Sequence, residues 1–235
     1  MNTKQLKEEW VDQPAFHVAI NDYFSECVKE DEQLLAHRKW VKEHAFGFGE
    51  DSFHWMWKLI VDDMPQEFSF CEVGVFRGQV LSLIKLLADR TLRSVYRYGV
   101  SPMSPIGIGW ESDYFADVEL LHKQFSLSTG YTIIHGLSED PKIVEETRHH
   151  APFDILFIDG GHEYDTVVAD LKNYAPMVKV GGYLVIDDAC NDLNFPPQGY
   201  FCGLQPVTQA VLDWDKTGFD FEFNVVHDRV YKKIT

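Results

Sequence analysis

The chain has 235 residues and a formal net charge of −16, from 21 Lys and Arg against 37 Asp and Glu. This charge disfavours nucleic acid and anionic membranes as partners, because both attract proteins through clustered Lys and Arg. The composition, 45% hydrophobic and 25% charged, is that of a globular protein and excludes wholesale disorder. The length fits one domain with an appendage.

The chain shows no signal for export or membrane insertion. Its first residues, MNTKQLKEEWVDQP, lack the apolar core of a secretory signal, and no run of about 18 apolar residues occurs. The four cysteines, Cys27, Cys71, Cys190 and Cys202, form no CxxC pair and no zinc spacing. We therefore expect free thiols and a reducing, cytoplasmic location.

Residues 1–65 are predicted to form a helical N-terminal extension. Apolar residues from Trp10 to Val28 recur at roughly helical spacing, and a second amphipathic stretch covers residues 51–64 and ends before Pro65. We interpret this extension as a lid or as the contact surface of a homo-oligomer.

Residues 66–235 are predicted to form an α/β domain. Predicted strands cover residues 68–75, 94–100, 131–136, 153–159, 181–189, 221–226 and 228–234, with helices at 79–90, 111–127, 139–150, 164–177 and 207–214. Such alternation indicates a doubly wound, mostly parallel seven-stranded sheet covered on both faces. The short link between the last two strands predicts an antiparallel hairpin at one edge.

A glycine motif, Glu72-x-Gly74-x-x-x-Gly78, ends the first predicted strand. Glycines allow a sharp turn and close approach of a ligand to the backbone, and the next helix offers N–H groups to a carboxylate or phosphate. Glu72 is placed to accept a hydrogen bond from an ammonium group. The motif is not GxGxxG, so the dinucleotide fingerprint is absent. An ordinary strand-to-helix turn is the alternative.

Acidic residues end two further strands. Asp159 follows the strand 153–159, and Asp187 and Asp188 follow the next strand. Ligands bind at the carboxyl ends of parallel strands, so these carboxylates are expected to converge. They would repel one another without a cation, and an all-oxygen set suits Mg²⁺, Mn²⁺ or Ca²⁺. His162 is three residues beyond Asp159 and is a candidate general base. Helix capping and turn formation are the alternative roles.

Residues 68–190 resemble the class I S-adenosylmethionine-dependent methyltransferases. The segment from Phe153 to Ala189, with its IDGGH and IDDA motifs, is similar to the metal-dependent sugar O-methyltransferases of macrolide pathways and to cephalosporin hydroxylase-like sequences. The resemblance implies that Asp159, Asp187 and Asp188 bind magnesium and that His162 acts as the base.

The same resemblance implies the cofactor site. The glycine loop is expected to hold the methionine part of the cofactor. Ser101 stands where the family usually has an acid for the ribose hydroxyls, and Ser138 falls in the segment beside the adenine ring. The cofactor-binding residues implied are Glu72, Gly74, Gly78, Ser101, Ser138 and Asp159.

The sequence thus predicts transfer of a methyl group from S-adenosylmethionine to a hydroxyl of a small molecule, a sugar or glycosylated metabolite above all. A vicinal diol, in a sugar or a catechol, would fix its own orientation by chelating the cation. Residues 191–203 are expected to close over the acceptor, with a surface loop as the alternative. Two rival functions stay open: a non-catalytic ligand-binding module on the same fold and a metal-dependent hydrolase.

Overall fold

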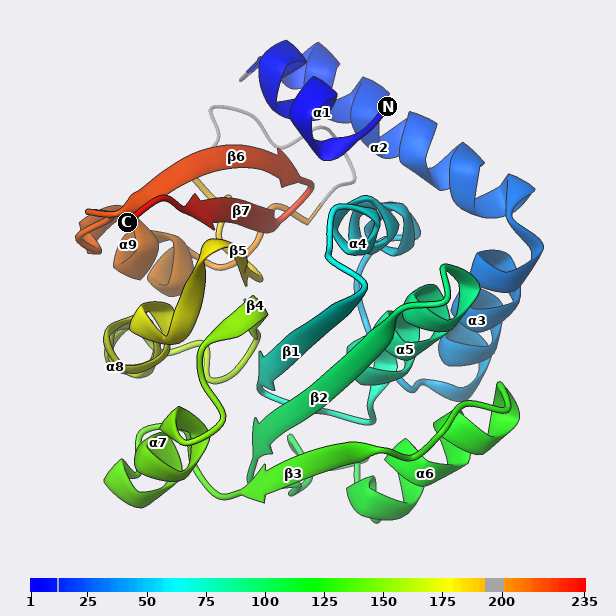
Figure 1. Ribbon diagram of the computed structural model, residues 1–235, viewed down its shortest axis with the longest axis vertical. Coiled ribbons are helices and arrows are strands. Elements are labelled where there is room, and N and C mark those ends of the chain that lie inside the picture. Colours follow the sequence, from blue (N-terminus) through cyan, green and yellow to red (C-terminus); the bar gives the residue numbers. More distant parts are fainter. Residues whose placement is uncertain (12, 193–200) are drawn as a thin grey trace.

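The computed structural model describes residues 1–11, 13–192 and 201–235 (Figure 1). The helices are α1 (Thr3–Glu9), α2 (Pro14–Glu30), α3 (Glu32–His44), α4 (Ser52–Asp62), α5 (Gln79–Arg90), α6 (Tyr114–Gln124), α7 (Pro141–Arg148), α8 (Tyr164–Tyr174) with the 3-10 turn η1 (Ala175–Met177), and α9 (Gln205–Asp213). The strands are β1 (Glu67–Val73), β2 (Ser94–Ser101), β3 (Tyr131–His135), β4 (Phe153–Ile158), β5 (Val178–Ile186), β6 (Phe219–Val225) and β7 (Asp228–Lys233).

The described strands form one seven-stranded sheet in the order β3-β2-β1-β4-β5-β7-β6. Strands β1 to β5 are parallel to one another, and β7 is antiparallel to both β5 and β6. The predicted α/β fold with its C-terminal hairpin is confirmed. Strand order reverses between β1 and β4, and such a switch point is where ligands bind in these sheets.

Some boundaries differ from the prediction. Helix α6 begins at Tyr114, because the side chain of Asp113 accepts a hydrogen bond from the N–H of Ala116 and caps the helix there. Strand β5 begins at Val178, upstream of the glycine pair at which the predicted strand started. No helix of the described residues is both long and apolar enough to cross a membrane.

The two faces of the sheet bury different sets of alternating residues, as the two-residue period of a strand requires. Phe70, Phe157 and Val185 point toward the face covered by α1 to α6. Their chain neighbours Leu156 and Ile186 point toward the face covered by α7, α8 and α9. This alternation also decides to which face the residues just beyond each strand belong.

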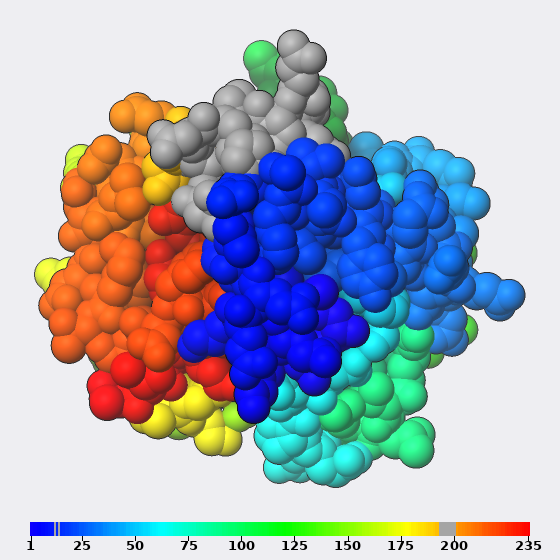
Figure 2. Space-filling model, turned by 90° about the horizontal axis from the view of Figure 1, so that it is seen from above, coloured from blue at the N-terminus to red at the C-terminus, as the bar shows by residue number. Residues whose placement is uncertain are grey.

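The N-terminal helices belong to the same hydrophobic core as the sheet. Leu6, Phe24 and Leu34 are fully buried together with residues of α4 and α5. Seen from above, these helices lie beside the C-terminal hairpin (Figure 2), where Lys7 forms a 2.5 Å ion pair with the buried carboxylate of Glu222. The extension therefore covers one face of the sheet.

A buried chain of hydrogen bonds joins the extension to the α/β domain. His37 of α3 contacts His54 of α4 (Nδ1 to Nε2, 2.9 Å) and Ser82 of α5 (Nε2 to Oγ, 2.9 Å). Because Ser82 donates to the carbonyl of Gln79, its oxygen accepts from His37, and His37 accepts from His54 through its other nitrogen. Both imidazoles must be neutral in this arrangement, since a further proton on His37 would face another N–H.

This network predicts that acid destabilises the fold. Burial lowers the pKa of His37 to about 3 and holds that of His54 well below the usual 6.5. As the pH falls, the unfolded chain therefore takes up protons at these histidines before the folded protein does. The contribution of the two neutral histidines to the free energy of unfolding is fully present above pH 6.5 and is lost as pH falls toward 3. In that range, each histidine that stays neutral in the folded protein lowers the free energy of unfolding by about 1.4 kcal/mol per pH unit. Urea unfolding at several pH values measures this slope, and His37→Gln should flatten it. The exposed His149→Gln should not, and a wild-type stability independent of pH would contradict the prediction.

Candidate active site

The carboxyl ends of three neighbouring strands place acidic side chains in one row. In the register of the sheet, Ile158 lies beside Ile186, and Ile186 lies opposite Arg229. One step further, Asp159 follows β4, Asp187 follows β5, and Asp228 begins β7. By the two-residue period, all three side chains point to the face that bears the N-terminal helices.

The three carboxyls of this row are in contact. Asp187 shares hydrogen bonds with Asp159 on one side and Asp228 on the other. Burial, and next the charge of Asp187, raise the pKa of Asp159 and of Asp228 well above the usual value. Burial also opposes ionisation of Asp187, but His227 and the two hydrogen-bonded carboxyls outweigh it and lower its pKa. The interactions within the row thus favour the ionised form of Asp187 and the protonated forms of its two neighbours, and a cation would relieve the repulsion among the three acids.

Two histidines flank Asp188, which stands in the turn after β5 in the left-handed region (φ 55°). Its Oδ1 is 3.0 Å from Nδ1 of His227, and its Oδ2 is 3.5 Å from Nε2 of His162. His162 has a half-exposed side chain, whereas His227 is buried. One ligand atom each of Asp187, Asp188 and His227 lie within 4.8 Å of one another.

The structure therefore brings two of the three predicted metal ligands into one compact group. Asp187 and Asp188 belong to the compact group, and Asp159 contacts Asp187 from outside that group. The donor set fits a divalent cation, because it combines carboxylate oxygens with an imidazole nitrogen. The buried Nε2 of His227 finds no hydrogen-bond partner among the described residues, as expected at a site made to hold a further group.

The glycine motif lies beside this row. Gly74 adopts φ +101°, and a Cβ there would stand 1.8 Å from the carbonyl oxygen of Asp159, so only glycine allows β1 and β4 to approach. Gly78 (φ +84°) caps the N-terminus of α5. Burial raises the pKa of Glu72 to about 8. Its Oε2 has no hydrogen-bond partner within the described part of the chain, and an ammonium group would supply both a donor and a charge.

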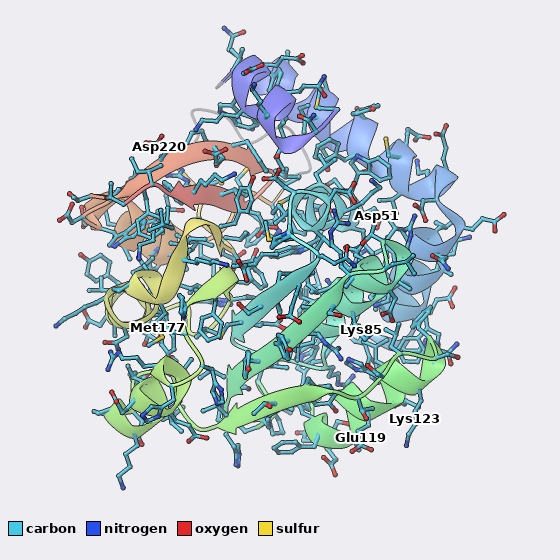
Figure 3. All side chains as sticks on the ribbon, in the orientation of Figure 1. Asp51, Lys85, Glu119, Lys123, Met177 and Asp220 are labelled. Carbon is cyan, nitrogen blue, oxygen red and sulfur yellow. The ribbon has the colours of Figure 1, made fainter. Side chains whose placement is uncertain are left out.

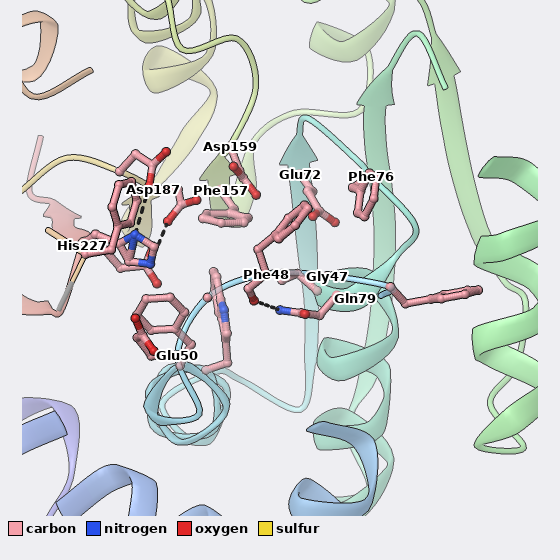
Figure 4. A pocket seen from close by; sticks show the side chains of 18 of the residues that line it. Gly47, Phe48, Glu50, Glu72, Phe76, Gln79, Phe157, Asp159, Asp187 and His227 are labelled. Atoms are coloured by element: carbon pink, nitrogen blue, oxygen red, sulfur yellow. Dashed lines mark hydrogen bonds and ion pairs between the residues drawn. The ribbon is translucent and has the colours of Figure 1, made fainter. Parts of the chain in front are cut away.

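One cavity of about 480 Å³ connects the acids to the glycine loop (Figure 4). Glu72, Asp159, His162, Asp187 and His227 open onto it. Much of its remaining wall is aromatic, from Phe46, Phe48, Phe53, Trp57, Phe76, Phe157 and Phe201, with Glu50 and Gln79 as polar side chains among them. The cavity therefore joins an acidic end to a mainly apolar end.

Three of the seven aromatic residues of this wall come from residues 46–53, the segment that leads from α3 into the first turn of α4. Nη1 of Arg38 donates to the carbonyl of Phe48 over 3.2 Å, and its Nη2 donates to that of Gly49. Nε2 of Gln79 donates to the same Phe48 carbonyl from α5 over 3.2 Å. The extension thus reaches the candidate active site through this segment. The other predicted lid, 191–203, lies mostly outside the described residues, which omit 193–200.

Two predicted cofactor contacts have internal partners. The buried hydroxyl of Ser101 donates to the carbonyl of Val75 (2.8 Å) and accepts from the N–H of Met103 (3.0 Å), so it holds the glycine loop against β2. The side chain of Ser138 contacts the buried carboxyl of Asp170. Neither serine lines the cavity, and their contact with a cofactor stays a prediction.

Sequence reasoning missed His227 and Asp228, which it placed in the link of the C-terminal hairpin. The feature that could have located these two residues is the pairing of the C-terminal hairpin with β5. Antiparallel pairing of β7 with β5 brings the hairpin turn to the carboxyl end of β5, where the hydrogen bond from Ala189 N–H to the His227 carbonyl (2.9 Å) fixes it.

The sheet order, the glycine loop and the acids at the strand ends define a Rossmann-like methyltransferase fold. A family described as a methyltransferase domain matches residues 71–189, just over half of the chain. The chain therefore belongs to this methyltransferase family, and the class inferred from its motifs is confirmed.

The chain is also similar to individual proteins and solved structures. An uncharacterized protein of Acanthamoeba polyphaga mimivirus is 29% identical over 182 residues, 72% of this chain and 74% of the viral protein. An S-adenosylhomocysteine-bound methyltransferase of Podospora anserina has a TM-score of 0.60 at 13% identity, covering 91% and 95% of the two chains. The mycinamycin-pathway methyltransferase MycE, solved with Mg and S-adenosylhomocysteine, has a TM-score of 0.56 at 18% identity over 86% of this chain and 53% of its own. At these identities the solved structures show a shared fold.

Proposed function

We propose that this protein transfers the methyl group of S-adenosylmethionine to a hydroxyl of a small molecule, with the help of a divalent cation, Mg²⁺ in the first instance. One observation carries the proposal. The acids at the ends of β4 and β5 open onto the same cavity as Glu72 and the glycine loop. The cofactor and cation of MycE support assigning both groups to this chain.

Each part of the site has a task in this reaction. Glu72 would accept a hydrogen bond from the ammonium group of the methionine part of the cofactor. The first N–H groups of α5 would bind the carboxylate of the same methionine part. Asp187 and Asp188, with Asp159 beside them, would hold the cation. When bound, the cation lowers the pKa of an acceptor hydroxyl by several units. His162 takes the hydroxyl proton, and its half-exposed ring can release it to solvent.

The bond changes follow from these positions. The acceptor oxygen attacks the sulfonium methyl in line, so that the new C–O bond forms as the S–C bond breaks. S-adenosylhomocysteine and the methyl ether leave. Holding the two reactants in one cavity contributes on the order of 7–11 kcal/mol to the acceleration of such a step.

A sugar or glycosylated metabolite is the proposed acceptor, and the aromatic wall adds a second candidate. Phe48, Phe53 and Phe76 line the cavity that also contains the acids. Such a wall stacks on an aromatic ring, and it equally covers the apolar body of a glycosylated metabolite. A catechol would present both the flat ring and the vicinal hydroxyls. Nucleic acid is not proposed, because the net charge is −16.

Two measurements test the proposed function. Calorimetric titration with S-adenosylmethionine and S-adenosylhomocysteine, with Mg²⁺ or Mn²⁺ present, should show binding. Absence of binding up to about 1 mM, where affinity is worth only about 4 kcal/mol, would exclude a methyltransferase. A screen of glycosides and catechols with deuteromethyl-labelled cofactor should then yield a labelled methyl ether, detected by mass spectrometry. Turnover with metal and water alone would favour a hydrolase instead.

Cytoplasmic location and self-association through the N-terminal helices remain proposals. The helices already cover one face of their own sheet, so a homo-oligomer would use their outer side, where Val11 and Tyr23 are exposed. Light scattering of the full chain would give the oligomeric state.

A further inference from the structure

We propose that His227 binds the cation directly through Nε2, and that this nitrogen makes the site prefer transition metals such as Mn²⁺ and Co²⁺ over Mg²⁺. The inference rests on the cation of the proposed function and deepens it, since it concerns which ion that site selects. It depends on residues of the C-terminal hairpin that lie outside the matched family segment, 71–189.

The first observation is an unused nitrogen. His227 is 5% exposed, and its Nε2 has no hydrogen-bond partner among the residues that the structure describes. A buried polar atom without a partner costs about 1–3 kcal/mol, so it marks a place where a further group is expected. The nitrogen lies 3.9 Å from Oδ1 of Asp187. That separation is too long for a hydrogen bond.

The same separation suits two ligands of one ion. With metal–ligand bonds of about 2.1 Å, adjacent ligands of an octahedral ion lie about 3 Å apart and opposite ligands about 4 Å apart. The 3.9 Å between His227 and Asp187 falls within this span. An ion between them would satisfy the free nitrogen and the carboxylate together.

The second observation is the state of the other ring nitrogen. Nδ1 of His227 is 3.0 Å from Oδ1 of Asp188, so it carries the hydrogen and donates to the carboxylate. In the neutral ring, the form that binds a cation, this leaves Nε2 with a free lone pair. Metal-binding histidines usually donate their second N–H to a carboxylate or carbonyl in this way, which fixes the tautomer and the direction of the ring.

Aromatic neighbours fix the ring plane as well. Phe53 stacks on His227 with ring centroids 4.7 Å apart and 23° between the planes, and Phe201 meets it edge-on at 5.1 Å. Figure 4 shows His227 beside Asp187 on the wall of the cavity. An imidazole held on two sides and oriented by Asp188 is prepared to bind without rearrangement.

The donor set then decides the ion. Carboxylates alone suit Mg²⁺ and Ca²⁺, whereas imidazole favours the later divalent metals. A site with Asp187 and His227 as ligands combines both classes. We therefore expect the affinity to rise from Mg²⁺ through Mn²⁺ to Co²⁺, with the nitrogen responsible for much of the difference.

The experiment uses the full chain, stripped of metal with a chelator. Calorimetry gives the affinities for MgCl₂, MnCl₂ and CoCl₂, and proton NMR of the Co²⁺ form detects a bound imidazole by its strongly shifted, exchangeable N–H signal. His227→Asn keeps a donor toward Asp188 and removes Nε2. This variant should lack the shifted signal and should bind Co²⁺ at least about tenfold more weakly, because a tenfold loss is already typical when only the hydrogen-bond partner of a metal-bound histidine is changed. The loss of Mg²⁺ affinity should be smaller. The exposed His149→Gln should change neither.

The outcomes are separable from those of the proposed function. An unshifted imidazole spectrum in the wild-type Co²⁺ form, which needs no variant to fold, would overturn the inference. So would a signal that survives His227→Asn but disappears in His162→Gln, or an unchanged ratio of Co²⁺ to Mg²⁺ affinity. If the protein does not bind S-adenosylmethionine but its Co²⁺ form shows the His227 signal, the proposed methyltransferase function is wrong and His227 is still a metal ligand.

Discussion

Replacing Asp187 by asparagine is expected to lower kcat by at least about a hundredfold while leaving the fold and the affinity for S-adenosylhomocysteine unchanged. Asp187 lies between the other two acids of the row, and the charge of His227 and the hydrogen bonds from these acids favour its ionised form. Asparagine has the same shape but no charge, so the cation loses its principal anionic ligand. A metal site of this kind contributes several kcal/mol to transition-state stabilisation, which corresponds to the stated loss.

Labelled methyl transfer to an acceptor found in the screen measures this effect. Asp220→Asn is the matched control, because Asp220 lies on β6 at the surface (Figure 3), with a 3.8 Å contact to Lys7, and is remote from the cavity. Its activity should equal that of the wild type. If Asp187→Asn retained full activity, the acids would not take part in the reaction. Unchanged biological activity without any methyl transfer would favour the non-catalytic binding module.

Gly74→Ala is expected to lower the free energy of unfolding by about 2–6 kcal/mol and to abolish cofactor binding. The φ of +101° strains an alanine by about 1–3 kcal/mol. The new methyl would also meet the backbone carbonyl of Asp159 at 1.8 Å. Because backbone cannot move aside as a side chain does, forced packing adds about 1–3 kcal/mol. Separation of β1 from β4 would displace Asp159 from Asp187.

Gly181→Ala separates the two causes of this loss. Gly181 also has a positive φ, +84°, but its added Cβ would meet nothing within 4 Å. The control should therefore lose only the backbone component. Equal unfolding free energies of the two variants in urea would show that the contact between β1 and β4 is not tight, contrary to the geometry.

Much of the fold could be predicted because local patterns and the final structure agree. Apolar runs such as 153–158 become buried parallel strands, and α4 lies between Asp51 and Pro65 as predicted, although the Asp51 side chain pairs with Arg38 instead of capping the helix. Helix ends were less predictable, since a single side chain decides them. Asp113 starts α6 three residues after Trp110, and Ser112 just before it is an equally suitable cap.

The site could be predicted where it depends on one strand and its end. Glu72, Asp159 and Asp187 each follow an apolar run, and parallel strands bring such ends to one edge. His227 and Asp228 could not be found in this way, because their position depends on how β7 registers against β5. The aromatic wall was equally hidden, since Phe48 and Phe53 reach the cavity from the extension through contacts made by Arg38 and Gln79.

The two ends of the cavity are expected to tolerate amino-acid substitutions to different degrees. Its reactive end is built by backbone pairing between strands, where a change at Gly74 or Asp187 disturbs several partners at once. Its apolar end rests on residues 46–53, outside the sheet, where Phe46 and Phe48 line the volume without contacting His227, whereas Phe53 stacks on that histidine. A library confined to Phe46 and Phe48 is thus the economical route to an enzyme that accepts a different molecule.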